Sequence, residues 1–243
     1  MIIAMLLAHL VGDYILQWDA LAQRKSREIK GVLQHGGIVT AATVLFALPF
    51  DAAWWPWALG IGLIHTAIDV GWLWASRRWH AARRSGRFPI VRLMIDQTLH
   101  LSVIAAALIV SGVITTPAGP ISALISTAIA HRWLSVLLGY VFITLPAWIL
   151  IEFTFYALLN GSAPDFTQAA KNKYPGSLER GLMVTFVLLG QFALVPLVAL
   201  PRLVFDSPTV IGQPRAALYL AEWLGSLAVA VAIGLMLKNL TGF

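Results

Sequence analysis

Apolar runs of close to 20 residues recur along the whole chain, and this pattern restricts the fold more than any other feature. A helix needs about 20 residues to cross the hydrocarbon core of a bilayer. In lipid, only a helix or a closed barrel satisfies every backbone polar group. Charged residues make up 12% of the chain, which is about half of their share in soluble domains. The sequence therefore predicts an all-α, polytopic transmembrane helical bundle.

About seven segments have the length and hydropathy of a span. They are residues 1–18, 35–50, 54–76, 93–115, 132–159, 181–201 and 216–238. The fifth is long enough to be tilted or broken. We predict a single integral membrane domain over 1–243, with four spans in 1–115 and three supporting spans in 116–243. Residues 121–130 are a candidate for an additional re-entrant or interfacial segment.

The 17 lysines and arginines are distributed unevenly between alternate connections. One side holds Arg24, Lys25, Arg27, Lys30, Arg77, Arg78, Arg83, Arg84, Arg87, Arg92, Lys171, Lys173, Arg180 and Lys238. The other side holds Arg132, Arg202 and Arg215. Because basic connections stay in the cytoplasm, we predict that the N-terminus lies outside and the C-terminus lies in the cytoplasm.

The net charge of +6 does not indicate a nucleic-acid partner, because the basic residues lie between apolar spans, where topology rules place them. We expect membrane lipid to be the main partner instead. The oligomeric state stays open. The chain has no cysteine, which excludes disulfides and thiolate metal sites.

Histidine and aspartate pairs inside the predicted spans have a regular spacing. His9 and Asp13 are four residues apart on the first span, and Gln17 continues the same helix face. The other two pairs are His65 with Asp69 on the third span and Asp96 with His100 on the fourth. Residues four apart lie on one face of a helix. Three such pairs among six histidines arise by chance in only about 1% of sequences of this composition.

These residues share a predicted depth in the membrane. With the N-terminus outside, the aspartates fall in the cytoplasmic halves of their spans and the paired histidines lie nearer the middle. His35, at the cytoplasmic start of the second span, adds a fourth imidazole. Ionisable groups at membrane depth are costly and usually functional. We therefore expect this set to converge inside the bundle: His9, Asp13, His35, His65, Asp69, Asp96 and His100.

Four imidazoles and three carboxylates are typical of a nitrogen and oxygen metal site. We expect one or two divalent ions, with zinc favoured and manganese or iron as alternatives. The four histidines would be ligands. Asp13, Asp69 and Asp96 would be ligands, orienting groups for the histidines, or a general base in catalysis. A proton or ion pathway and polar packing between helices remain the alternative interpretations.

Three further residues are candidates for binding a substrate. Gln17 and Lys25 follow the first pair closely and are placed to contact an anionic group. Glu152, in the cytoplasmic part of the fifth span, is a candidate base, ligand or substrate contact, with helix packing as the alternative.

The motifs resemble a bacterial inner-membrane family catalogued as domain of unknown function 3307. The resemblance rests on the run from His9 to Gln17, on Lys25 and His35, and on residues 65–69 and 96–100. Residues 178–180 and 188–191 also look similar. The resemblance implies a multi-pass protein of the bacterial inner (cytoplasmic) membrane. More distantly, the pattern is similar to that of membrane-bound metal-dependent hydrolases.

The leading hypothesis is a metal-dependent membrane hydrolase. Its substrate would be lipid-linked or amphipathic, and it would enter from the cytoplasmic leaflet, where basic connections attract its charge. A transporter or channel for metal ions or protons that uses the same residues is the first alternative. A non-catalytic accessory subunit of a membrane complex is the second.

Overall fold

A computed structural model of the chain describes residues 1–78, 87–115, 119–160, 173–210, 212 and 216–242. Within these residues every regular element is a helix and no strand occurs. The predicted all-α architecture is therefore confirmed. Contacts divide the chain into two compact units, and each unit has its own hydrophobic core.

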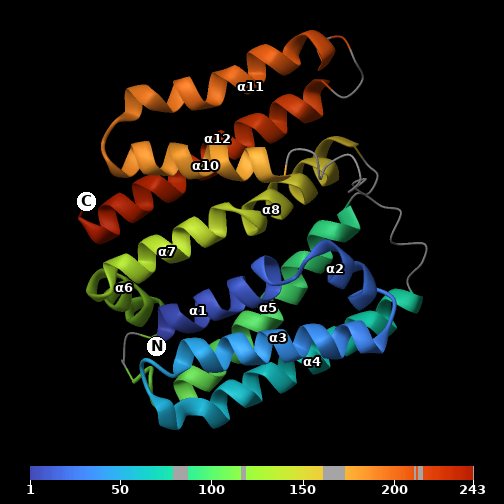
Figure 1. Ribbon diagram of the computed structural model, residues 1–243, viewed down its shortest axis with the longest axis vertical. Helices are drawn as coiled ribbons and strands as arrows, with labels where there is room; N and C mark the ends of the chain where they lie inside the picture. Colours follow the sequence, from blue (N-terminus) through green and yellow to red (C-terminus); the bar gives the residue numbers. More distant parts are fainter. Residues whose placement is uncertain (79–86, 116–118, 161–172, 211, 213–215, 243) are drawn as a thin grey trace. The chain divides into compact units, whose positions relative to one another are not determined.

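The first unit comprises Met1–His80 and Leu93–Leu138. It extends beyond the predicted four-span segment, because it also includes the apolar helix that follows residue 119. Its helices, drawn from blue to green in Figure 1, are α1 (Ile2–Leu10), the π-helical turn η1 (Val11–Ile15), α2 (Asp19–Lys25), α3 (Ile29–Ala47), η2 (Ala52–Trp54), α4 (Trp55–Arg78), α5 (Arg87–Val110) and α6 (Pro120–Ala130). The start of α5, up to Arg92, is assigned to the second unit.

The second unit comprises Ala81–Arg92 and Gly139–Phe243. Helix α7 (Arg132–Ile143) begins in the first unit and ends in the second. The helices that follow are α8 (Leu145–Phe155), η4 (Tyr156–Asn160), α10 (Lys173–Leu188), η6 (Phe192–Leu194), α11 (Val195–Val210) and α12 (Ala216–Thr241). The break at Thr144, followed by Pro146 in the first turn of α8, shows that the long fifth span is broken.

Four helical segments are long and apolar enough to cross a membrane without interruption: Ile29–Ala47, Ala52–Ser76, Arg87–Val110 and Ala216–Thr241. Two further spans are possible if each bent helix pair counts as one. In the first pair, Ile2–Ile15 and Asp19–Lys25 meet at 90°. In the second pair, α6 and α7 meet at 108°. The described residues thus supply four to six spans, fewer than the seven predicted.

The predicted span 181–201 is wrong, because a tight turn divides it. Helix α10 ends at Leu188, and Gly190 has a φ of 71°, the left-handed conformation that ends many helices. Gly190 N–H donates to Val187 O, and Gln191 N–H donates to Phe186 O. The chain then runs back as α11, which brings Arg202 within 3.0 Å of Glu179. The sequence does not reveal this turn, because apolar residues lie on both sides of a single glycine and give one continuous hydrophobic run.

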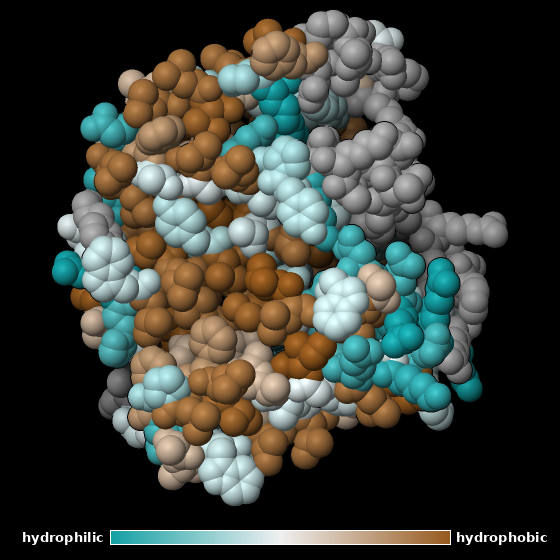
Figure 2. All heavy atoms as spheres, viewed as in Figure 1, coloured by the Kyte–Doolittle hydropathy of each residue, from teal (hydrophilic) through white to brown (hydrophobic). Residues whose placement is uncertain are grey.

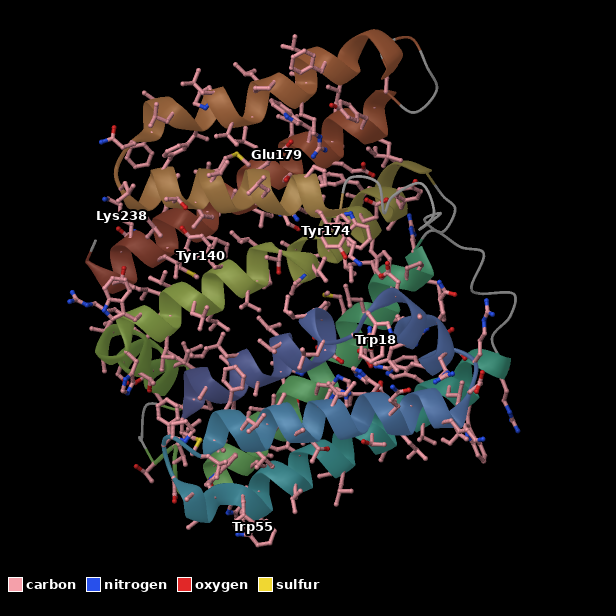
Figure 3. All side chains as sticks on the ribbon, in the orientation of Figure 1. Trp18, Trp55, Tyr140, Tyr174, Glu179 and Lys238 are labelled. Carbon is pink, nitrogen blue, oxygen red and sulfur yellow. The ribbon has the colours of Figure 1, made fainter. Side chains whose placement is uncertain are left out.

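The turn also changes the predicted grouping of charges. Lys238 Nζ donates to Leu188 O at the end of α10. Lys173 begins the same helix, about 24 Å away for its 16 residues. Figure 3 shows Tyr174 and Lys238 at opposite ends of α10. Lys238 and Lys173 therefore lie at opposite ends of α10, which differs from their predicted grouping, and the orientation of the chain relative to the membrane stays a prediction.

Single cysteines would test this arrangement cleanly, because the natural chain has none. We expect the exposed positions of Tyr174→Cys and Asn239→Cys to react with an impermeant maleimide from opposite faces of sealed vesicles. Ser26→Cys, between α2 and α3, should be labelled from the cytoplasmic face. Labelling of positions 174 and 239 from the same face would contradict the hairpin of α10 and α11.

Many large apolar side chains lie on the surface, as expected where lipid is the solvent. Leu63 and Val110 in the first unit are 70% and 71% exposed, and Phe205 in the second is 79% exposed. Hydrophobic residues cover much of the face in Figure 2, whereas hydrophilic ones gather over α2 and the start of α3. Trp18 and Trp55 lie exposed toward opposite ends of the first unit, as interfacial tryptophans do (Figure 3).

Candidate metal centre

Two glycine–threonine contacts hold α3 and α4 close together. A Cβ atom on Gly36 would overlap the Thr66 side chain, and one on Gly62 would overlap Thr40. Thr40 Oγ1 donates to Gly36 O at 2.7 Å, and Thr66 Oγ1 donates to Gly62 O at 2.8 Å. Small residues with internally bonded hydroxyls allow close helix packing in lipid. These contacts lie beside His35 and His65.

Replacing Gly36 by alanine should therefore separate the two helices. We expect Gly36→Ala to lower the free energy of unfolding by about 1–3 kcal/mol, the usual cost of overpacking. Gly37→Ala is the matched control, because a Cβ there meets no atom within 4 Å. Thermal unfolding in detergent measures both variants. Equal melting temperatures would show that the close contact does not fix the spacing.

Helix α1 places His9, and the π-helical turn that continues it places Asp13. The two side chains point the same way, with His9 Nε2 4.0 Å from Asp13 Oδ2. Single π-helical turns are rare and occur often at functional sites. Gly12 in this turn packs against Val39 of α3, where an added Cβ would come within 3.2 Å. The absence of a side chain at Gly12 thus lets η1 approach α3.

The predicted convergence occurs inside the first unit. All four histidines are buried, as are Asp13 and Asp69, whereas the Asp96 side chain is 19% exposed. The rings of His65 and His100 stack with their centroids 4.0 Å apart. His9 and His35 flank them, at centroid distances of 5.6 Å from His100 and 5.4 Å from His65. Four segments, η1 with α1, α3, α4 and α5, therefore contribute to one buried cluster.

Asp13 lies at the centre of this cluster. Its Oδ1 atom accepts a hydrogen bond from His35 Nε2 at 3.0 Å and lies 3.6 Å from His65 Nε2. Its Oδ2 atom lies 4.0 Å from His9 Nε2 and 4.0 Å from His100 Nδ1. One carboxylate thus contacts all four imidazoles, and each of its oxygens faces a different pair.

The other two carboxylates lie on opposite sides of Asp13. Asp69 Oδ2 is 3.3 Å from His65 Nε2 and 3.7 Å from His35 Nε2. Asp96 Oδ2 is 3.7 Å from His100 Nδ1. Both i,i+4 pairs on α4 and α5 therefore direct an imidazole and a carboxylate into the cluster, as their spacing predicts.

Lys25 brings a positive charge into the cluster. Its Nζ atom lies 2.9 Å from Asp69 Oδ2 and 3.9 Å from Asp13 Oδ1. The bend between η1 and α2 turns the chain by 90° and so returns Lys25 toward Asp13. Three carboxylates against one ammonium leave an excess of negative charge when the imidazoles are neutral.

Gln97 is a member of the cluster that the sequence analysis missed. Its Nε2 group donates to Asp13 Oδ2 at 3.2 Å and to Asp96 Oδ2 at 3.1 Å, and its Oε1 accepts from His9 Nε2 at 3.0 Å. A neutral amide carries no charge that would mark it as a candidate. Its position three residues before His100, inside an apolar helix, was the available signal.

The remaining two predicted substrate contacts have different environments. Gln17 follows η1, and its Oε1 is buried with no hydrogen-bond partner among the described residues. Glu152 is buried on α8 of the second unit. Their roles in binding a substrate stay predictions.

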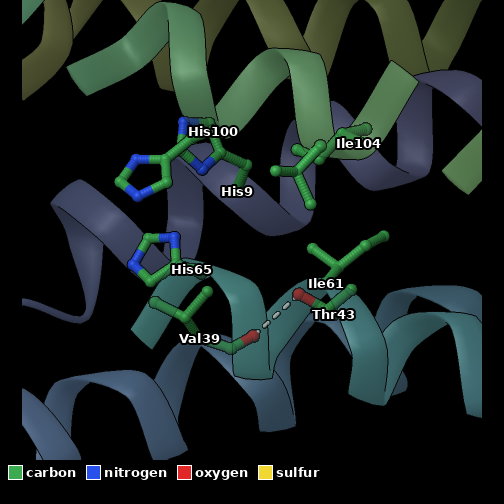
Figure 4. Close-up of a pocket in the computed structure, with 8 residues that line it drawn as sticks. His9, Val39, Thr43, Ile61, His65, His100 and Ile104 are labelled. Atoms are coloured by element: carbon green, nitrogen blue, oxygen red, sulfur yellow. Dashed lines mark hydrogen bonds between the residues drawn. The ribbon is translucent and has the colours of Figure 1, made fainter. Parts of the chain in front are cut away.

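A small cavity of about 10 Å³ lies beside the imidazoles of His9, His65 and His100 (Figure 4). Its other walls are largely apolar and include Ile61 and Ile104. Such a space holds roughly one water molecule. Any larger molecule must therefore approach from elsewhere, and the side chains of Lys25 and Asp96, each 19% exposed, mark an accessible side.

The donor set fits a divalent metal ion. Ligand atoms lie within 4.8 Å of one another in three overlapping groups: His9, Asp13 and His100; Asp13, His35 and His65; His65, Asp69 and His100. In the described part of the chain, neither ring nitrogen of His100 has a hydrogen-bond partner, nor does His35 Nδ1. A buried polar atom without a partner is costly, and a ligated metal would satisfy one nitrogen of each ring.

The fold and this cluster define a helical membrane protein with a buried His/Asp centre compatible with metal binding. The chain belongs to the family described as Protein of unknown function (DUF3307), whose family model matches residues 1–128. The match includes the whole cluster, whereas the similarity noted at 178–191 lies outside it. No curated protein and no solved structure matches the chain. Similarity to membrane-bound hydrolases stays a prediction.

Proposed function

We propose that the protein is a metal-dependent hydrolase of the bacterial inner membrane that acts on a lipid-linked or amphipathic substrate. The observation that carries the proposal is the meeting of four imidazoles, Asp13, Asp69 and Lys25 within the first unit. A divalent metal bound there, with zinc favoured, would activate water and stabilise negative charge on the reacting group.

The residues have distinct roles in this proposal. The four histidines and Asp13 hold the metal, and Gln97 orients His9 and Asp13 through its hydrogen bonds. Asp96 is partly exposed and lies 3.7 Å from His100, so it serves both as a donor to the metal and as the base that takes a proton from water. Asp69, whose Oδ2 lies 2.9 Å from Lys25 Nζ, acts as a further ligand.

Lys25 supports a substrate that carries an anionic group, such as a phosphoester. It lies on the accessible side of the cluster, next to exposed basic residues at Arg24, Arg27 and Lys30. Basic residues at a membrane surface attract anionic headgroups, at about 1 kcal/mol each. We propose that this surface faces the cytoplasmic leaflet, and that the substrate headgroup enters between α2 and α5.

The surroundings of the cavity favour hydrolysis over transport. Ile61 and Ile104, which line it, belong to a hydrophobic core with Ile2, Met5 and Leu108. An ion that passed the histidines would meet this apolar core, where charge is expensive. Transport of metal ions or protons and an accessory role in a membrane complex remain outcomes that experiment separates.

Metal analysis of the purified chain tests the proposal directly. We expect one or two equivalents of a divalent metal in the natural protein, and a loss of at least one equivalent in His65→Ala and in His100→Ala. His131→Ala is the control, because this exposed ring contacts Phe50, outside the cluster. The metal-loaded protein should cleave bis-para-nitrophenyl phosphate or release phosphate from phosphatidic acid in mixed micelles.

Three results would overturn the proposal. A natural protein that binds no zinc, manganese or iron after reconstitution would favour the accessory role. Bound metal with flux of that metal into liposomes and no hydrolysis would favour transport. Retention of all metal in both histidine variants would place the site elsewhere.

A further inference from the structure

The cluster has two halves that share one carboxylate. Asp13 Oδ1 faces His35 and His65, whereas Asp13 Oδ2 faces His9 and His100. Among the described residues, two of the three compact donor groups join Asp13 with one of these histidine pairs or the other. The third joins Asp69 with the stacked rings of His65 and His100, and no group contains both His9 and His35.

Each half also has a carboxylate of its own. Asp69 lies next to His65 and His35, at 3.3 Å and 3.7 Å. Asp96 lies 3.7 Å from His100. Both halves thus contain two imidazoles, one oxygen of Asp13 and one further carboxylate. This composition suits zinc, manganese or iron.

We propose that the cluster binds two divalent cations, with Asp13 as the bridging carboxylate between them. The proposal rests on the metal site of the proposed function and specifies its nuclearity. One ion takes four to six ligands, whereas this cluster offers four imidazoles and three carboxylates. Paired ions about 3.5–4 Å apart are common in enzymes that cleave phosphoesters, and the two oxygens of one carboxylate suit that spacing.

The two halves of the cluster differ in charge, so they should also differ in their affinity for a cation. Lys25 Nζ lies 2.9 Å from Asp69 and 3.9 Å from the Asp13 oxygen that faces His35. An ammonium there opposes a cation in the same half. The half with His35, His65 and Asp69 therefore binds its ion more weakly than the half with His9, His100 and Asp96.

Titration of the purified full chain with Mn²⁺, followed by electron paramagnetic resonance, tests both consequences. We expect two equivalents to bind in two affinity steps, with an exchange-coupled spectrum after the second. His35→Ala should remove the weaker step and keep the tighter one. Lys25→Met should tighten the weaker step by at least about tenfold and leave the first unchanged. Lys30→Met, an exposed lysine, is the control.

The outcomes separate this proposal from the one on which it rests. A single equivalent in the natural protein that is lost in both His9→Ala and His35→Ala would overturn the dinuclear centre and keep a mononuclear one. No bound Mn²⁺, Zn²⁺ or Fe²⁺ at all would overturn both. Two equivalents without exchange coupling would overturn the Asp13 bridge. The titration of the natural protein decides the stoichiometry even if a variant does not fold.

Discussion

Asp13→Asn is expected to lower metal affinity by more than about 100-fold and to abolish hydrolysis. Changes to groups that only support metal ligands cost 10–100-fold in affinity or activity, and Asp13 contacts all four imidazoles directly. Asparagine has nearly the same shape but no charge, so the effect isolates the carboxylate. Calorimetric titration with Zn²⁺ and the phosphodiester assay measure the two losses.

Asp51→Asn is the matched control for this variant. Asp51 is exposed and accepts a hydrogen bond from Ala53 N–H at 2.8 Å at the start of η2. Asparagine serves equally well at that position, so we expect metal affinity and melting temperature to stay unchanged. If Asp13→Asn bound zinc as tightly as this control, Asp13 would not be a ligand.

Lys25→Met is expected to raise the KM for an anionic substrate by more than about tenfold while leaving kcat for a neutral ester little changed. Loss of an ion pair to a phosphate removes a charge-assisted contact worth about 1.5–3 kcal/mol. Lys25→Arg keeps the charge and should restore most of the affinity. Steady-state kinetics with bis-para-nitrophenyl phosphate and para-nitrophenyl acetate make the comparison.

The direction in which metal affinity changes when Lys25 is removed shows whether this lysine opposes a cation or holds Asp69 in place. If Lys25 only opposes a cation, its removal should tighten metal binding and leave the KM of the anionic substrate unchanged. If Lys25 only holds Asp69 in place, its removal should weaken the binding of the metal and the binding of the anionic substrate. Weaker substrate binding together with tighter metal binding supports the proposal.

Much of the cluster could be predicted because helix geometry is local. The spacing of His9 with Asp13 and of His65 with Asp69 fixes a shared helix face without any tertiary information. His35 has no such partner, and only its expected depth placed it with the others. Gln97 was missed because a neutral amide carries no charge penalty that would draw attention in an apolar helix.

The errors in the fold have a different physical origin. Hydropathy measures the solvent preference of each residue and does not report the direction in which the chain runs. Two short apolar helices joined by a turn therefore give the same hydropathy pattern as one long span. Gly190 and its two hydrogen bonds reverse the chain between α10 and α11. Because of this reversal, Arg202 forms an ion pair with Glu179 and Lys238 donates a hydrogen bond to Leu188 O. The predicted grouping of Lys238 with Lys173 therefore depended on the same misplaced span boundary.

The paired glycine–threonine contacts between α3 and α4 also limit how ions can enter and leave. Each glycine receives the threonine of the other helix, so a slide of either helix by one residue would drive a Cβ into a threonine side chain. These contacts therefore restrict changes in the spacing of His35 and His65. If the cluster binds ions as proposed, they would enter on the accessible side at Lys25 and Asp96, so the kinetics of metal loading would depend on a residue that is also proposed to meet the substrate.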